Sequence, residues 1–147
     1  MNTAIPVSQT DIDAALARIA AGEADCFILR PGCEPLPGHG RGVRPLLQLL
    51  ENAPETLHGA VLADKIIGKA AAAIMATGGV VEVHTNIIST PARALLEAEG
   101  IKVVATEEVP QILNRNKSQM CPIDSQLEGI ESIEECVTVL QNMLITL

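Results

Sequence analysis

Residues 58–106 decide the fold, and they read HGAVLADKIIGKAAAAIMATGGVVEVHTNIISTPARALLEAEGIKVVAT. Three short apolar runs have the length and composition of buried strands: residues 58–63, 80–84 and 101–106. Alanine-rich residues 66–77 form the helix between the first two runs, and Ser89 caps the helix between the last two. This alternation predicts right-handed crossovers and a largely parallel sheet covered by helices on both faces.

The preceding residues add a second type of connection. Ser8 or Thr10 caps a first helix, and residues 24–29 read as a buried strand. The segment 30–42 is rich in Gly and Pro, so we expect a turn or hairpin with a weak strand at residues 34–36. A second helix begins near Pro45. An antiparallel first pair of strands would make the sheet mixed. Because helices cover both faces of this sheet, the predicted fold class is a three-layer α/β/α sandwich.

The C-terminal residues read as a separate helix. Residues 109–124 are irregular, with one helical turn, and residues 1–128 form the predicted α/β domain. Residues 129–147 carry an apolar stripe at helical spacing: Ile130, Ile133, Val137, Leu140, Leu144 and Leu147. This helix either packs on its own domain or forms a dimer interface. We favour a homodimer contact, because an exposed apolar patch usually marks an interface.

Composition limits the partners. The chain has 147 residues, a net charge of −8 and Phe27 as its single aromatic residue. An acidic surface without stacking platforms argues against nucleic acid as the partner. The sequence has no apolar run of membrane-spanning length and no signal-peptide pattern, so we expect a cytoplasmic protein without a membrane partner. The four cysteines form no CxxC pair, and free thiols are the expected state.

Four short motifs occur in a fixed order: Gly42-Val43-Arg44-Pro45-Leu46-Leu47, Asp64-Lys65-Ile66-Ile67-Gly68-Lys69-Ala70-Ala71, Asn114-Arg115 and Cys121-Pro122. Together they resemble an uncharacterised prokaryotic family known as domain of unknown function 1893. The resemblance covers residues 1–125 and makes the tail beyond residue 128 look like an addition to the family core. It implies a cytidine-deaminase-like fold and no established activity.

The zinc site of that fold is not encoded. Zinc deaminases place H-x-E at the start of one helix and P-C-x-x-C at the start of the next. Neither pattern occurs, and residues 41–45 and 64–69, where the topology would put them, contain no His or Cys. The histidines also lack metal-like spacing. We therefore expect neither a metal nor another cofactor.

Basic side chains stand at both of these predicted helix starts. Arg41 and Arg44 flank the first, and Lys65 and Lys69 occupy the second. Cations there oppose the helix dipole, and an anion bound between the two starts would offset that cost. We therefore predict a small anionic metabolite as ligand, nucleotide-like by fold analogy. The alternative is that these cations are solvated or paired with acids such as Glu51 and Asp64.

Further residues complete the predicted site. Asp64 ends one predicted strand, and ligands of α/β folds sit beyond the carboxyl ends of parallel strands. Asn86 follows another strand, and Gly68 would allow a close backbone approach. The remaining members of the ligand-binding set are Gly42, Asn114 and Arg115.

A second hypothesis makes the protein an enzyme. Cys121 lies in the irregular segment near Arg115, which would lower the pKa of its thiol. Cys121 would then act as nucleophile or redox thiol, with Asp64 or a histidine as proton carrier. A packing role at the turn before Pro122 is the competing interpretation.

Overall fold

The computed structural model describes residues 6–39, 43–113 and 122–145. Its centre is a five-stranded mixed sheet with the order β2-β1-β3-β4-β5. The strands are β1 (Cys26–Leu29), β2 (Leu36–Gly38), β3 (Val61–Ile67), β4 (Glu82–Ser89) and β5 (Lys102–Val109). β1 pairs antiparallel with β2 and β3, and β3, β4 and β5 are mutually parallel. The predicted antiparallel start and parallel remainder of the sheet are confirmed.

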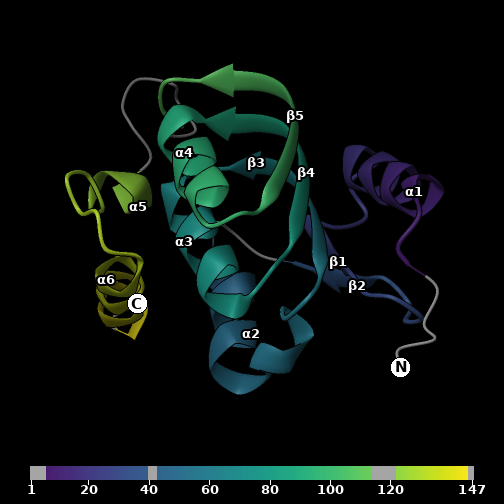
Figure 1. Ribbon diagram of the computed structural model, residues 1–147, viewed down its shortest axis with the longest axis horizontal. Coiled ribbons are helices and arrows are strands. Elements are labelled where there is room, and N and C mark those ends of the chain that lie inside the picture. Colours follow the sequence, from purple (N-terminus) through teal and green to yellow (C-terminus); the bar gives the residue numbers. More distant parts are fainter. Residues whose placement is uncertain (1–5, 40–42, 114–121, 146–147) are drawn as a thin grey trace.

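Helices cover the sheet on both sides (Figure 1). α1 (Gln9–Ala20) packs against β1 and β3 on one face. The other face carries α2 (Arg44–Asn52), α3 (Lys69–Gly78) and α4 (Thr90–Ala98), and η1 (Pro54–Thr56) follows α2. A further layer outside α3 contains α5 (Pro122–Ser125) and α6 (Ile133–Ile145). The sheet thus lies between helices on both faces, as predicted, and the C-terminal helix lies outside these three layers.

The composition of α3 follows from its position. Six of its residues from Ala70 to Met75 are buried, because the sheet, α4 and α6 surround the helix. Alanine keeps all of these neighbours close, since its methyl group needs little space.

On the opposite face of the sheet, Phe27 packs with Ile12 of α1, and the Arg18 guanidinium lies 4.5 Å from the centre of the Phe27 ring.

Two helix starts are confirmed as the sequence predicts them. Ser8 and Asp11 form a capping box at α1, and Ser89 accepts a hydrogen bond from the backbone N–H of Ala92 in α4. The first parallel strand, in contrast, is longer than predicted. It runs through Asp64 and Lys65 to Ile67, because Ile66 and Ile67 continue its pairing with β4.

The observed extents of β3 and β4 correct the predicted places of three residues. Asp64 lies inside β3 rather than at its end, and Lys65 belongs to the strand rather than to the start of a helix. Asn86 lies inside β4 for the same reason, because Ile87 and Ile88 extend the strand beyond it. The short strand predicted at residues 34–36 lies at Leu36–Gly38.

The C-terminal helix packs on its own domain. α6 lies against α3, and its Cys136, Val137 and Leu140 join the main core. Val137 and Leu140 of the predicted stripe are buried in this contact, whereas Ile130 and Ile133 are partly exposed. The homodimer contact stays a prediction. No helix in the described residues is long and apolar enough to cross a membrane.

Candidate functional site

The start of α3 is closed by a side chain from the C-terminal segment. Asp124 Oδ1 accepts a hydrogen bond of 3.0 Å from the backbone N–H of Ala70. Gly68 precedes the helix, and a Cβ atom added there would lie 2.0 Å from Asp124 Oδ2. Burial raises the pKa of the Asp124 carboxyl, while the N–H groups of Ala70 and Lys69 and the Lys69 charge lower it. A carboxylate of the chain itself thus occupies the position where a helix start favours an anion.

Lys69 reinforces the same contact. Its Nζ donates to the backbone oxygens of Leu127 at 2.7 Å and Ile130 at 2.6 Å. The ammonium group therefore faces carbonyls of the segment between α5 and α6. Gly68 and Lys69, both predicted to bind ligand, hold the C-terminal segment against α3 in this structure.

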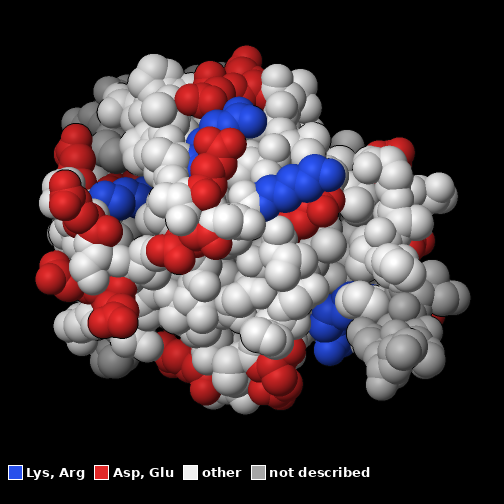
Figure 2. All heavy atoms as spheres, viewed as in Figure 1, with Lys and Arg blue, Asp and Glu red and all other residues white. Residues whose placement is uncertain are grey.

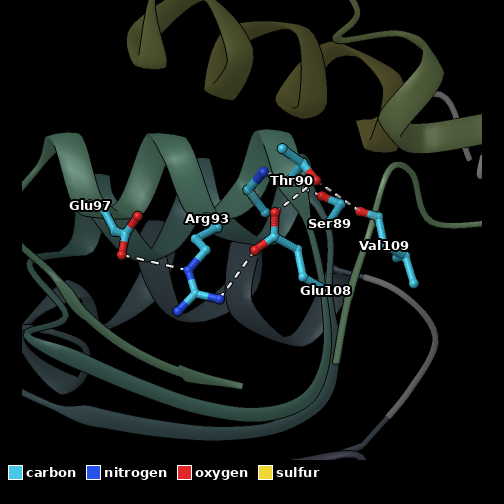
Figure 3. A network of polar contacts seen from close by, with 7 residues as sticks. Ser89, Thr90, Arg93, Glu97, Glu108 and Val109 are labelled. Carbon is cyan, nitrogen blue, oxygen red and sulfur yellow. Dashed lines mark hydrogen bonds and ion pairs between the residues drawn. The ribbon is translucent and has the colours of Figure 1, made fainter. Parts of the chain in front are cut away.

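Side chains of the protein itself also form hydrogen bonds and ion pairs at the start of α4 (Figure 3). Ser89 caps the first turn, and Thr90 Oγ1 donates to Glu108 of β5 at 2.9 Å. Arg93 bridges Glu108 at 3.2 Å and Glu97 at 3.5 Å. These contacts tie the carboxyl ends of β4 and β5 to the helix.

Three polar side chains form a row across the centre of the sheet. Cys26 of β1 pairs with Asp64 of β3, which pairs with Thr85 of β4, and paired residues lie on the same face. We call these three residues the polar row. A Cβ atom added to Gly38 would lie 2.4 Å from Cys26 Sγ and 3.6 Å from Pro45 Cβ. The first turn of α2 therefore adjoins the end of the polar row at Cys26.

Burial sets the protonation of the polar row. It raises the pKa of Asp64 to about 7, against the lowering effect of the Lys65 and Ile66 N–H groups. It also raises the pKa of the Cys26 thiol to about 12, with Asp64 as the second cause. Asp64 nevertheless remains partly exposed, whereas Cys26 and Thr85 are buried. The pKa of the Asp64 carboxyl therefore lies near neutral pH.

The start of α2 lacks the side-chain cap that the other two helices have. Val43 occupies its N-cap position without a side-chain hydrogen bond, and Arg44 follows as an exposed first residue. Lys65 and Asn86 are exposed on β3 and β4. The other predicted site residues lie outside the described residues: Arg41, Gly42, Asn114, Arg115 and Cys121.

Sequence reasoning missed three members of this region. The pairing that brings Cys26 and Thr85 beside Asp64 depends on strand register, which the sequence leaves open. Asp124 reaches α3 from a position 54 residues away from Ala70, and nothing local marks it as a cap. Among residues 6–39, 43–113 and 122–145, no group of three His, Cys, Asp or Glu side chains is placed to hold a metal ion.

A mixed five-stranded sheet between helical layers, with a polar row at its centre, defines an α/β protein of sandwich architecture. The chain belongs to the family described as TM1506, domain of unknown function (DUF1893), whose model matches residues 15–144. This match includes α6, so the prediction that the family ends near residue 125 and the tail is an addition is wrong.

A solved structure shows the same fold. It is the crystal structure of a DUF1893 family protein (TM1506) from Thermotoga maritima, with a TM-score of 0.82 and 21% sequence identity. The similarity covers 97% of this chain and 96% of that one. The search of curated proteins found no match.

Proposed function

We propose that the protein binds a small anionic metabolite between the polar row and the start of α2. The ligand's anionic group lies against the first turn of α2 and Arg44, and its other end forms hydrogen bonds with Asp64. The proximity of Cys26 and Pro45, which would both lie within 4 Å of a Cβ atom added to Gly38, joins the polar row to α2 and carries this proposal.

The polar row supports a binding role. Placing a carboxyl, a thiol and a hydroxyl between the apolar residues of a sheet costs free energy unless they find partners. Thr85 donates within its own strand, to the oxygen of Ile87 at 3.1 Å. Asp64 accepts from the adjacent Lys65 N–H at 2.7 Å, and a carboxyl oxygen can accept more than one hydrogen bond. Such breaches of the apolar pattern are concentrated at functional sites.

The charges support an anionic ligand at α2 rather than at α3. The N–H groups at the start of α3 already face Asp124, and the start of α4 has Ser89. Val43, the N-cap residue of α2, forms no side-chain hydrogen bond, and Arg44 offers a guanidinium that binds phosphate or carboxylate with two hydrogen bonds. The position of Asp64 suits the opposite end of the ligand, because its carboxyl both donates and accepts near neutral pH.

The fold supports a nucleotide-like ligand by analogy alone. We propose a cytidine-deaminase-like arrangement, which is consistent with the mixed sheet and with helices on both faces. Fold does not imply function, so the class of ligand depends on the chemistry of Arg44 and Asp64.

A thermal-shift screen of nucleotides, nucleosides, sugar phosphates and small carboxylates tests the proposal. We expect a binder whose affinity falls by about 1–3 kcal/mol in Arg44→Ala, because charge-assisted hydrogen bonds have that size. Asp64→Asn should weaken binding of the same ligand. Lys102→Ala is the matched control, since Lys102 is an exposed cation on the far edge strand.

Calorimetry of the four proteins with the best ligand decides the outcome. A ligand that binds Arg44→Ala and Asp64→Asn as tightly as the unmodified chain would place its site elsewhere. Loss of binding in Lys102→Ala as well would indicate a general effect of net charge.

A further inference from the structure

A groove of about 990 Å³ lies between α4, the outer side of α3 and residues 130–134. Its lining includes the small side chains of Ala76, Ala94 and Ala98, together with Ile130 and Ile133. Small residues let the backbone of another chain approach the two helices closely. The groove is separate from the polar row, which lies on the sheet beneath the helix layer.

Acidic side chains outnumber basic ones in the lining of the groove. Glu99, Glu131 and Glu134 line it and are exposed. Lys69 also lines the groove, but its ammonium is bound to two backbone carbonyls. Figure 2 shows acidic side chains gathered over α4 and over the side formed by α5 and α6. The groove therefore presents carboxylates around an apolar floor.

Two sources of negative charge, a carboxylate and the end of a helix dipole, meet at the Glu99 end of the groove. Glu99 is the C-cap residue of α4, where the helix dipole places negative charge, and α4 has no basic residue in its last turn. An acid at this position opposes the dipole. A cation bound at this end of the groove would offset both the carboxylate and the dipole.

We propose that this groove binds a basic amphipathic helix of a partner protein. Apolar side chains of the helix pack on the alanine floor, and its Lys or Arg side chains pair with Glu99 and Glu131. Recognition of an amphipathic helix by an apolar groove with a complementary rim is a common mode of peptide binding.

A second copy of this chain does not have the required chemistry. Each described helix contains at most one Lys or Arg. The net charge of −8 also makes two copies of the chain repel each other. The partner is therefore a different, basic protein.

A labelled peptide of about 14 residues, with Lys and Leu at helical spacing, is the probe, since it spans about 21 Å as a helix. Fluorescence anisotropy should show binding to the full chain. Glu99→Lys and Glu131→Lys should each weaken binding by about tenfold, the size expected when an ion pair becomes a like-charge pair. Glu99→Lys should not lower the melting temperature, because a cation suits the end of α4.

Glu107→Lys is the matched control, because it makes the same change in charge at an exposed site on β5, outside the groove. Equal binding by Glu99→Lys and Glu107→Lys would overturn the proposal. Equal binding of a peptide with the same composition in scrambled order would overturn it too, as would no binding at all. A dimer of the chain that dissociates in Glu99→Lys would assign the groove to a second copy instead.

Discussion

Asp64 shows at the scale of one residue how position changes chemistry. The residue is partly exposed, and yet burial raises the pKa of its carboxyl to about 7. An unfolded chain would have a pKa near the reference value of 3.8. The native state therefore binds the proton more tightly than the unfolded state, and the free energy of unfolding falls as the pH rises from about 4 to about 7, where the unfolded chain has already lost this proton.

Asp64→Asn tests this linkage. The amide keeps an oxygen to accept the Lys65 N–H but cannot ionise. As the pH rises from about 5 to 7, the unmodified chain should lose stability and the variant should not. The difference between their free energies of unfolding should change in favour of the variant by up to about 1.4 kcal/mol for each pH unit. Urea unfolding of both proteins at several pH values measures the difference. A difference that does not change with pH would show that Asp64 has an ordinary pKa.

At the scale of elements, the start of α3 holds the C-terminal segment in place. Asp124 caps the helix, Lys69 bonds to the oxygens of Leu127 and Ile130, and α6 then packs along α3. The basic residue that opposes the dipole of α3 is thus used to fix another part of the chain. Gly68 is required at this point, because a side chain there would meet the Asp124 carboxylate.

Lys69→Met should loosen this attachment. It removes the charged donor from two partly buried carbonyls, and we expect a loss of about 1–3 kcal/mol in the free energy of unfolding. Hydrogen exchange should increase in α6 while the strands of the sheet stay protected. Lys65→Met is the control, because Lys65 is exposed and its loss should change stability by less than about 0.5 kcal/mol. Equal effects of the two substitutions would contradict a structural role for Lys69.

At the scale of the whole molecule, α6 is part of the core rather than an appendage. Leu140 is fully buried, and Val137 is 7% exposed. The family match to residue 144 agrees with this packing. The homodimer remains a prediction, and of the tail stripe that suggested it Val137 and Leu140 are buried in the core.

Truncation after Gly129 should therefore destabilise the monomer. Loss of the Val137 and Leu140 contacts alone removes about 3–6 kcal/mol of hydrophobic stabilisation, which is a large part of the stability of a domain of this size. Circular dichroism with light scattering should show a partly unfolded or aggregating chain. A truncated protein that stays folded, monomeric and equally stable would contradict the role of α6 in the core.

The sequence by itself determined the elements, because their signals are local. Ser8 and Ser89 mark helix starts, and short apolar runs mark strands, so the alternation of residues 58–106 was sufficient to predict the parallel part of an α/β sheet. The basic residue at the start of α3 was also visible, as a breach of the dipole rule at Lys69.

Only the tertiary structure decided which groups meet. Strand register places Cys26 and Thr85 beside Asp64, and the return of the chain brings Asp124 to Ala70. The observed end of β3 differs from the predicted one for a related reason. Ile66 and Ile67 pair with β4, so the strand continues through the polar residues before them. Contacts between distant segments depend on the balance of packing over the whole molecule, and no local pattern encodes that balance.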